Sequence, residues 1–330
     1  MIVSYDTINM QIDKPPYQIT SEILSLLSLV YIKIGEISAL QLSPPPAELR
    51  KSNRIKTIQS TLAIEGNSLT ETQITAILEN KRVLAPQKDI LEVQNAIAVY
   101  NQLHSFKAFQ VKSLLQAHQI LMKGLILDAG KLRKGNVGIV KGSKVTHVAP
   151  SDTMVPVLLT NLFHYLKYDP DPILIKSCVF HYEFEFIHPF IDGNGRMGRL
   201  WQTILLIREY PMFEFLPIES VIKADQVKYY QALNTSDHQG NSTFFIVFML
   251  ESILKALNSL LEMPSISLTE ERRINLFKEV IGTKPFTRKS YLSHFKNISA
   301  ATASRDLKNA TDKGILSKTG DKRLTSYIFS

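Results

Sequence analysis

Residues 188 to 199 decide the architecture and read His188-Pro189-Phe190-Ile191-Asp192-Gly193-Asn194-Gly195-Arg196-Met197-Gly198-Arg199. Two glycines flank Asn194, and glycine allows the tight turns that bring successive backbone N–H groups onto one anion. Apolar residues at helical spacing follow, so this loop is expected to open a helix. The N-terminus of a helix attracts anions through its N–H groups and its dipole. The stretch therefore predicts a phosphate-binding turn at the start of a helix.

Side chains in the same stretch add acid–base and metal-binding chemistry. Asp192 offers the hard oxygen that Mg²⁺ prefers. Arg196 and Arg199 stand three residues apart on one helical face, where guanidinium groups can bind distal phosphates. His188 precedes the turn, where an imidazole can take a proton from an attacking group. Each feature alone has a plainer explanation as a turn, a packed histidine or surface charge, but their combination favours a bound polyphosphate.

Every fixed position of the signature His-Pro-Phe-x-Asp-Gly-Asn-Gly-Arg-x-x-Arg is present, so the chain resembles the Fic family, whose members mostly transfer AMP from ATP to protein hydroxyl groups. The resemblance implies that His188 is the catalytic base, that Asp192 holds Mg²⁺ at the α- and β-phosphates, and that Arg196 binds the β-phosphate. It also implies an anion hole made by backbone N–H groups of the Gly-Asn-Gly turn and by the Asn194 side chain. The nucleotide-binding residues implied in this stretch are Asp192, Gly193, Asn194, Gly195, Arg196, Met197, Gly198 and Arg199.

A hairpin is expected over residues 137 to 148, where β-branched residues alternate with glycine and polar residues around Lys141-Gly142-Ser143-Lys144. In proteins similar to the Fic family such a hairpin follows an arginine, here Arg133, and forms a flap over the active site. A flap edge could hold an extended target segment by strand addition and present its hydroxyl group to His188. A hairpin that binds no ligand is the open alternative. The flap residues expected to cover the nucleotide are Val137, Gly138, Ile139 and Val140.

Two further residues are assigned to the nucleotide by the resemblance. Tyr229 begins a Tyr-Tyr-Gln-Ala-Leu segment that is similar to the family segment lining the adenine pocket. Asp237 stands where relatives often carry a polar contact to adenine. Because aromatic residues at this spacing are more often core residues, a packing role for Tyr229 stays open.

Residues 61 to 67, Thr-Leu-Ala-Ile-Glu-Gly-Asn, form a second motif. They fit the pattern Ser/Thr-x-x-x-Glu-Gly/Asn, which resembles the inhibitory helix of self-restrained Fic proteins. Thr61 and Glu65 stand four residues apart on one helical face, and the Gly-Asn pair suits a left-handed helix end that displays Glu65. The resemblance implies that Glu65 pairs with Arg199 and excludes the γ-phosphate. The alternatives are a segment that only ends a helix, or a glutamate that positions water to release AMP from a modified target.

Hydrophobic periodicity predicts that most of the first 260 residues are helical, because apolar residues recur at three- and four-residue spacing. The expected helices cover residues 20–39, 47–65, 71–79, 88–104, 110–124, 152–167, 172–187, 194–208, 225–235 and 242–261. The predicted fold class is therefore mainly α, with a Fic-type helical core and a β-hairpin flap.

The composition is that of a folded soluble protein, with 45% hydrophobic and 21% charged residues in a chain of 330. The single cysteine, Cys178, excludes an internal disulfide and a thiolate metal cluster, which agrees with a reducing compartment. The longest unbroken apolar run, residues 244 to 250, is too short to cross a bilayer, and the N-terminus has no secretory signal pattern. We expect a cytoplasmic protein without membrane association.

Basic charge is concentrated at the end of the chain, where residues 265 to 330 hold 13 Lys and Arg against 6 Asp and Glu. Their pattern of three helices and a hairpin resembles a winged helix-turn-helix, an α+β module found in many Fic proteins. Its third helix and its wing would bind DNA. The residues expected to contact DNA are Ser304, Arg305, Lys308, Lys322 and Arg323. Docking to a protein partner, or forming a homodimer, is the open alternative.

The predicted organisation has three parts. Residues 1–46 form an accessory segment. Residues 47–262 form the Fic core, with the inhibitory helix at 47–66 and the flap at 137–148, and residues 268–330 form the winged helix-turn-helix domain. The expected function is an autoinhibited protein adenylyltransferase that uses ATP and Mg²⁺ to modify a Ser, Thr or Tyr hydroxyl group of a target protein, its own chain included. The alternative is a DNA-binding regulator whose Fic core senses nucleotide or removes AMP from a modified target.

Overall fold

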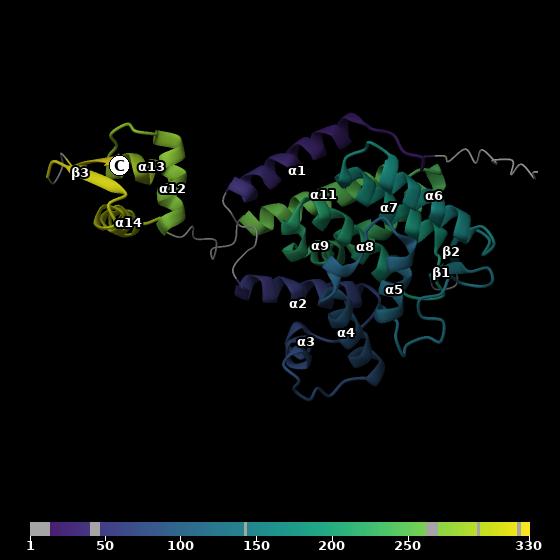
Figure 1. The fold of residues 1–330 in the computed structure, drawn as a ribbon. Helices are drawn as coiled ribbons and strands as arrows, with labels where there is room; N and C mark the ends of the chain where they lie inside the picture. Colours follow the sequence, from purple (N-terminus) through teal and green to yellow (C-terminus); the bar gives the residue numbers. More distant parts are fainter. Residues whose placement is uncertain (1–13, 40–46, 142–143, 262–269, 296–297, 322–324) are drawn as a thin grey trace, which may run out of the picture. The chain divides into compact units, whose positions relative to one another are not determined.

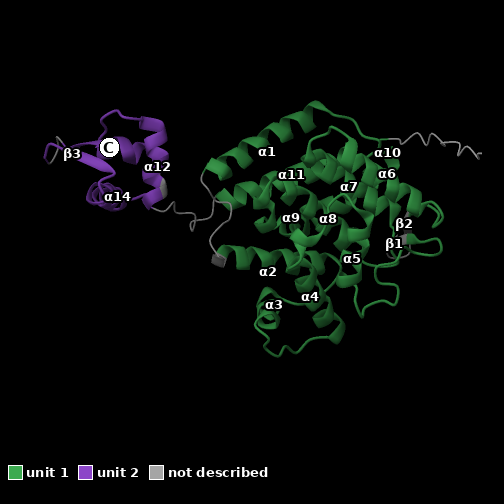
Figure 2. Cartoon of the chain, in the orientation of Figure 1, with its two compact units in different colours: residues 1–262 green, residues 263–330 purple. Residues whose placement is uncertain are grey.

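The computed structural model describes residues 14–39, 47–141, 144–261, 270–295, 298–321 and 325–330. The chain divides into two compact units, residues 1–262 and 263–330 (Figure 2). The predicted domain boundary at residues 262 to 268 lies outside the described residues. Each unit is described by itself.

Unit 1 is built almost entirely from α-helices, which confirms the predicted fold class (Figure 1). Its helices are α1 Ser21–Ala39, α2 Ala47–Ile64, α3 Glu71–Leu78, α4 Gln87–Tyr100, α5 Val111–Leu121, α6 Val155–Tyr168, α7 Ile173–Ile187, α8 Asn194–Glu209, α9 Ile218–Ala224, α10 Gln226–Gln239 and α11 Thr243–Leu261, with short 3₁₀ turns at η1 Leu103–Ser105 and η2 Pro211–Phe215. Strands β1 Gly138–Lys141 and β2 Lys144–Val148 complete the unit.

The pair α7 and α8 forms the centre of unit 1. Both helices bury residues on all sides, as expected of helices surrounded by other elements. Helix α11 packs against α7, α9 and α10, and it runs beside α1 along one edge of the unit (Figure 1). Length and composition alone would let α11 cross a membrane, but 56% of that stretch is buried inside the unit. Its apolar faces therefore contact neighbouring helices.

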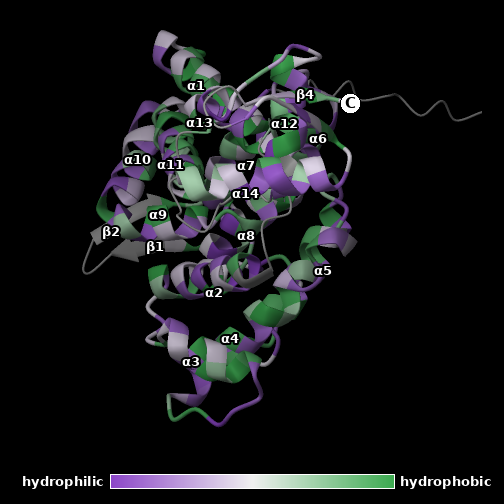
Figure 3. Ribbon diagram, turned by 90° about the vertical axis from the view of Figure 1, so that its left-hand side faces the viewer, coloured by the Kyte–Doolittle hydropathy of each residue, from purple (hydrophilic) through white to green (hydrophobic). Residues whose placement is uncertain are grey.

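Helix α2 brings the second sequence motif to the centre of the unit. It carries bands of both hydrophobic and hydrophilic residues, as an amphipathic helix does (Figure 3). Its apolar face, with Ile55, Ile58 and Leu62 buried, packs on α9 and also contacts α4 and α8. The helix ends at Ile64. As a result, Glu65 lies beside the start of α8.

Strands β1 and β2 form the predicted antiparallel hairpin, in which Gly138 pairs with Val148 and Lys141 with Lys144. A register shift between Ile139 and Val140 marks a bulge. The hairpin contacts α10 through β2. Its predicted turn residues, 142 and 143, lie outside the described residues.

Unit 2 consists of α12 Glu270–Ile281, α13 Arg288–His294, α14 Ala300–Asp312 and the antiparallel strands β3 Leu316–Thr319 and β4 Ser326–Phe329. Side chains of Thr287 and Ser299 cap α13 and α14. A buried bidentate ion pair joins Arg273 of α12 to Asp306 of α14, with Nε–Oδ2 and Nη2–Oδ1 distances of 2.6 and 2.7 Å. The unit closes its own apolar core around Phe277.

Candidate functional site

The loop from His188 to Gly193 connects α7 to α8 and forms the floor of the candidate site. His188 ends α7 in the left-handed region, with a φ of 48°, which few residues other than glycine adopt. Its Nδ1 lies 3.3 Å from the Glu185 carbonyl oxygen. A carbonyl can only accept, so Nδ1 carries the hydrogen and Nε2 has the lone pair of the neutral ring. This tautomer suits a general base at Nε2.

Arg133, which lies before the hairpin, holds the backbone at the start of this loop. Its Nε donates to the His188 carbonyl at 2.8 Å, and its guanidinium nitrogens also donate to the carbonyls of Gly135, Pro150 and Ile187. The Arg133 side chain is buried, and burial lowers the pKa of its guanidinium. The rigid five-donor fork of arginine suits this set of carbonyls better than lysine could.

Two side chains fix the second half of the loop. The Asn194 side chain binds the backbone of Phe190 in both directions, accepting from its N–H at 3.0 Å and donating to its carbonyl at 2.9 Å. His118 stacks on the Phe190 ring, accepts from the Gly130 N–H at Nδ1, and donates from Nε2 to the Asp192 carbonyl. Burial lowers the pKa of His118 to about 4, so the ring is neutral at pH 7. The sequence assigned the Asn194 amide to phosphate; in this structure its oxygen and its nitrogen both bind the backbone of Phe190.

Helix α8 begins at Asn194 directly beneath the cavity. Its N-cap, Gly193, has a φ of 86° and no side-chain hydrogen bond to the first turn. A β-carbon at Gly193 would come within 2.7 Å of the Met122 sulfur, so both the backbone angle and the space favour glycine. The first-turn N–H groups of a helix have no partners within the helix. They therefore offer a site for an anion at the start of α8.

A cavity of about 480 Å³ opens above this helix start. The loop and the first residues of α8 form its floor, and α10 forms one wall. The lining residues from these and neighbouring elements are Glu65, Glu185, Phe186, His188, Ile191, Asp192, Gly193, Asn194, Gly195, Arg199, Val227, Tyr229, Tyr230, Gln231, Leu233, Asn234 and Asp237. The volume suits a nucleotide-sized ligand. The cavity brings together His188, the glycine turn, Arg199, Tyr229 and Asp237, all of which the sequence assigned to one site.

Glu65 reaches into this cavity from the end of α2. The helix end is left-handed at Gly66, with a φ of 92°, and the Asn67 N–H donates to the Leu62 carbonyl. A Glu65 oxygen lies 2.7 Å from Nη2 of Arg199. The carboxylate is so close to the first turn of α8 that a β-carbon at Gly195 would clash with it. A carboxylate therefore lies beside the helix start that would bind a phosphate.

Thr61 makes two further contacts between α2 and Arg199. The Arg199 residue is 2% exposed. The Thr61 hydroxyl group accepts from Nε at 3.0 Å, and the Thr61 carbonyl accepts from Nη2 at 3.1 Å. Burial alone would lower the pKa of Arg199, but the ion pair with Glu65 holds that pKa above its ordinary value. Arg199 therefore stays charged, and its guanidinium is engaged by the segment that carries Glu65.

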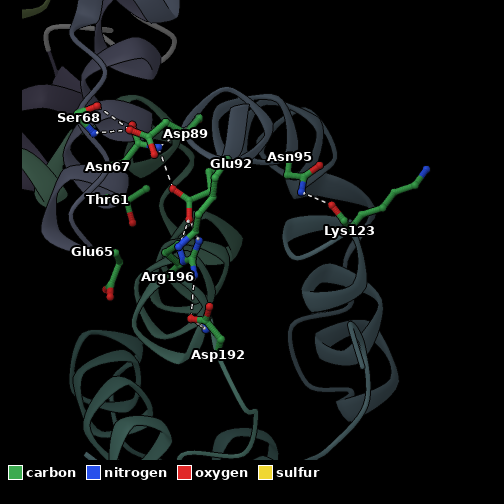
Figure 4. A network of polar contacts seen from close by, with 12 residues as sticks. Thr61, Glu65, Asn67, Ser68, Asp89, Glu92, Asn95, Lys123, Asp192 and Arg196 are labelled. Carbon is green, nitrogen blue, oxygen red and sulfur yellow. Dashed lines mark hydrogen bonds and ion pairs between the residues drawn. The ribbon is translucent and has the colours of Figure 1, made fainter. Parts of the chain in front are cut away.

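Arg196 lies under the loop and does not line the cavity. Its Nη2 is 3.0 Å from Oδ1 of Asp192, and its Nη1 is 3.2 Å from Oε1 of Glu92 on α4 (Figure 4). The Asp192 side chain is 50% exposed and lines the cavity. Asp192 can therefore face a ligand while one of its oxygens is held by Arg196.

Asp192 is the candidate metal ligand. Among the described residues, no group of three or more His, Cys, Asp or Glu could hold a metal ion. A single carboxylate such as that of Asp192 still fits Mg²⁺ in a nucleotide site. Mg²⁺ is usually held by one or two carboxylates together with substrate phosphates and waters. The exposed Asp192 carboxylate beside an anion-binding helix start meets that requirement.

Tyr229 and Asp237 lie on α10, where the sequence placed the adenine site. The Tyr229 hydroxyl group contacts Nε2 of His181 at 3.1 Å, and Nδ1 of His181 contacts Gln202 at 2.7 Å. His181 is fully buried, and burial lowers its pKa to about 3. Asp237 accepts from the Tyr182 hydroxyl group at 3.0 Å. The Tyr229 hydroxyl group is thus used inside the protein, and its ring forms part of the cavity wall.

Some of the assigned nucleotide residues lie outside the lining. Met197 and Gly198 are buried in α8, and a β-carbon at Gly198 would come within 2.9 Å of His181, so both residues serve helix packing. Val137 and Gly138 begin the hairpin but do not line the cavity. Ile139 and Val140 lie in β1, and their side chains are outside the described part of the chain. Conversely, Glu185, Phe186 and Asn234 line the cavity although none of them was assigned to the site. The acidic and aromatic stretch before His188 was a signal for Glu185, but it was interpreted as orienting the helix.

Curated proteins of similar sequence are named protein adenylyltransferases. The chain is 27% identical over 226 residues to "Protein adenylyltransferase fic-1" from Caenorhabditis briggsae, covering 64% of this chain and 42% of that protein. It is 28% identical over 218 residues to "Protein adenylyltransferase Fic" from Nematostella vectensis, covering 62% of this chain and 48% of that protein. The chain thus spans less than half the length of these curated relatives.

A family model and a solved structure agree with these matches. Residues 108–206 match the model of the Fic/DOC family. The crystal structure of a Fic family protein from Desulfovibrio desulfuricans G20 is 36% identical, with a TM-score of 0.74, and the match covers 96% of this chain and 98% of that one. The match thus spans nearly the full length of both chains. On this evidence the chain belongs to the Fic/DOC family.

Proposed function

We propose that this protein is an autoinhibited protein adenylyltransferase, which transfers AMP from ATP to a hydroxyl group of a target protein. The observation that carries the proposal is the cavity in which His188, the start of α8 and Arg199 meet, with Glu65 ion-paired to Arg199. The printed names of the curated relatives support the same reaction.

His188 is the base in this proposal. Its Nε2 takes the proton of a Ser, Thr or Tyr hydroxyl group, because Nδ1 is engaged by the Glu185 carbonyl. The hydroxyl oxygen then bonds to the α-phosphorus of ATP. The bond from that phosphorus to the bridging oxygen breaks, and pyrophosphate leaves with the electron pair. The left-handed backbone of His188, held by Arg133, keeps the imidazole at the cavity wall.

The first turn of α8 and two arginines hold the phosphates. N–H groups of that turn bind the anionic oxygens, and Arg199 binds the γ-phosphate when Glu65 is withdrawn. Arg196, which is assigned to the β-phosphate, does not line the cavity in this structure and would act on that phosphate from behind the loop. Mg²⁺ bound at Asp192 would offset the charge that develops on the leaving pyrophosphate. Tyr229 and Asp237 line the part of the cavity that would take the adenosine.

Glu65 inhibits this reaction through two effects. Its carboxylate occupies Arg199, and it places negative charge where the γ-phosphate would bind. Replacing Glu65 with glycine removes both effects, whereas Thr61 still contacts Arg199. We expect Glu65→Gly to raise AMP transfer at least about tenfold, since one lost charge-assisted contact corresponds to roughly 1.4 kcal/mol or more.

The test follows labelled AMP from ATP onto protein, first onto the chain itself and then onto lysate proteins. Wild type, Glu65→Gly, Glu65→Gln and the double variant Glu65→Gly/His188→Ala are compared at equal folded concentration. We expect strong labelling by Glu65→Gly, intermediate labelling by Glu65→Gln, and none by the double variant. Labelling that persists without His188 would refute its role as base, and equal labelling of wild type and Glu65→Gly would refute the inhibition.

A second possible role of Glu65 is in the removal of AMP from a modified target by water. A carboxylate beside the phosphate position could also orient a water molecule that releases AMP from a modified target. Incubation of a premodified target with wild type and with Glu65→Gly separates the two roles. AMP release that requires Glu65 would add hydrolysis to the function, and release by neither protein would leave inhibition as its role.

Unit 2 supports a second candidate function, binding of DNA by a winged helix-turn-helix. Arg305 and Lys308 are exposed on α14, opposite the buried Leu307. Ser304, also assigned to DNA, accepts a hydrogen bond from Arg288. Exposed cations on one helix face suit contact with phosphates. Lys322 and Arg323 of the predicted wing lie outside the described residues.

The full chain and an Arg305→Glu/Lys308→Glu variant can be compared for binding to duplex DNA. We expect wild-type binding that weakens steeply with salt, and a loss of binding in the variant. The absence of binding to DNA at low salt by the wild type would instead favour a protein-docking role for unit 2.

A further inference from the structure

Both arginines of the loop motif pair with acidic residues that precede the loop in sequence, but inhibition by Glu65 explains only one pair. Arg196 pairs with Glu92, in the middle of α4, and the two residues are 4% and 7% exposed. The Nη1–Oε1 distance is 3.2 Å. Burying two charges is costly unless they are well paired, so this contact needs a reason beyond surface electrostatics.

Glu92 is in turn held by the segment that follows the inhibitory motif. Nδ2 of Asn67 donates to the second Glu92 oxygen, Oε2, at 2.8 Å, and also to the Asp89 carbonyl at 3.1 Å. Oδ1 of Asn67 accepts from the Leu69 N–H at 3.0 Å, which fixes the orientation of the amide. Figure 4 shows Glu92 between Asn67 and Arg196, and Arg196 between Glu92 and Asp192. Four buried or loop-bound side chains therefore form one continuous row.

In the part of the chain that the structure describes, the side chains of Glu92 and Arg196 have few other hydrogen-bond partners within reach. Both carboxylate oxygens of Glu92 are engaged, one by Arg196 and the other by Asn67. Nε of Arg196 is buried, and among the described residues it has no hydrogen-bond partner. Without Glu92 the guanidinium would keep only its contact with Asp192. A cation held on one side only, inside the protein, would move towards that single carboxylate or towards water.

We propose that Glu92 is a positioning residue for Arg196, and that Asn67 ties this position to the segment that carries Glu65. The inference rests on the proposed function, in which Arg196 serves the β-phosphate. Glu92 holds the guanidinium behind the loop from the side opposite Asp192. Asn67 stands two residues after Glu65, so a displacement of Glu65 from Arg199 also acts on the Asn67–Glu92 contact. The state of the inhibitory segment is thereby linked to both arginines.

Residue Asn95 provides a matched control on the same helix. It is one turn further along α4 than Glu92, and both residues are 7% exposed. Its Nδ2 donates to the Lys123 carbonyl at 2.8 Å, on the side away from Arg196 (Figure 4). Asn95→Ala therefore removes a buried polar contact of α4 and leaves the row intact.

The experiment uses the full chain in the Glu65→Gly background, with the added changes Glu92→Ala, Glu92→Gln, Asn67→Ala or Asn95→Ala. The melting temperature and the Kd for ATP are measured for each protein. The kcat for AMP transfer onto the chain itself and the KM for ATP are measured as well. We expect Glu92→Ala to lower kcat/KM at least about tenfold and to weaken ATP binding. Glu92→Gln keeps an acceptor for Arg196 and should recover part of that loss, and Asn67→Ala should lower kcat/KM in the same direction. Asn95→Ala should lower the melting temperature only.

Unchanged kcat/KM and ATP affinity in Glu92→Ala would overturn the proposal, as would an equal loss in Asn95→Ala. If Glu92→Ala does not fold, Glu92→Gln decides the question, since a loss of ATP affinity at an unchanged melting temperature supports the positioning role and no loss refutes it. If the Glu65→Gly protein binds ATP but transfers no AMP, the proposed function fails. In that case the Kd values for ATP still decide whether Glu92 positions Arg196.

Discussion

At the scale of single residues, Arg133 holds the loop between α7 and α8 by donating to four backbone carbonyls. It donates to the carbonyls of His188 and Ile187 on one side, and to those of Gly135 and Pro150 on the other. Lysine cannot supply this planar set of donors, so several buried carbonyls would lose their partner. We expect Arg133→Lys to lower the free energy of unfolding by about 1–3 kcal/mol and to reduce AMP transfer in the Glu65→Gly background. Denaturant unfolding and labelling assays check both effects.

Arg208 offers the comparison for that experiment. It is exposed in the last turn of α8, at the end of the helix away from the loop, with its guanidinium 4.6 Å from the Phe109 ring centroid. Arg208→Lys should leave stability and labelling nearly unchanged. An equal loss of stability and labelling in both variants would show that the four carbonyl contacts of Arg133 are not needed for either property.

The candidate site shows what sequence can and cannot predict at this scale. The motif at residues 188 to 199 predicted that a glycine turn opens a helix beside His188, because that arrangement depends on neighbouring positions in the chain. The roles of the turn and of His188 in binding and catalysis stay predictions. Three contacts could not be predicted from the motif: that of Arg133 with His188, that of His118 with Asp192 and that of Glu92 with Arg196. The two residues of each pair lie more than fifty positions apart, and only the packing of helices joins them. The Asn194 amide was assigned to phosphate because a motif does not reveal that both ends of this amide bind Phe190.

Glu219 makes the free energy of unfolding depend on pH, and a single substitution can remove this contribution. Burial raises its pKa from the ordinary value of 4.5 to about 7, and Tyr100 donates to its Oε1. The folded protein keeps this proton up to about pH 7, whereas the unfolded chain releases it near pH 4.5. Because the folded state binds more protons in that window, the free energy of unfolding falls as the pH rises through it.

The variant Glu219→Gln removes this titration and keeps the acceptor for Tyr100. At pH 5 we expect the variant and the wild type to have similar stability. At pH 8 the variant should be the more stable protein by up to about 3 kcal/mol, since one pKa unit corresponds to roughly 1.4 kcal/mol. Urea unfolding at both pH values measures the difference, and a difference that does not change with pH would contradict the assignment.

At the scale of elements, the close packing of α7 on α8 depends on a glycine. A β-carbon at Gly198 would approach the His181 ring to 2.9 Å, and that ring is fixed by Gln202 and Tyr229. We expect Gly198→Ala to lower the free energy of unfolding by about 1–3 kcal/mol through overpacking. Gly35 in α1 is exposed with nothing within 4 Å of a β-carbon, so Gly35→Ala should raise stability by about 0.5–1 kcal/mol. Thermal unfolding of both variants should give shifts of opposite sign.

Helices that follow a long apolar period were predicted well, and so was the eight-residue α3, but α9 was not predicted. The helices α7 and α8 begin and end within one residue of their expected bounds, because Pro172 and the glycine turn mark their starts. The seven-residue α9 was missed, since a helix of two turns shows too little periodicity for a pattern to emerge. The helix expected over residues 88–104 ends at Tyr100, and a 3₁₀ turn follows at Leu103–Ser105.

At the scale of the whole molecule, the chain contains two separately closed cores, and this predicts independent unfolding. Unit 2 buries its own apolar cluster around Phe277 and joins α12 to α14 through the Arg273–Asp306 ion pair. Unit 1 contains the cavity, α2 and every residue assigned to the nucleotide. A chain of residues 1–262 should therefore unfold at the temperature of unit 1 in the full chain, and its Glu65→Gly form should label itself at a similar rate. Calorimetry of the full chain should show two transitions, of which the shorter chain keeps one. A single transition that shifts by more than a few degrees on truncation would mean that the two cores stabilise each other.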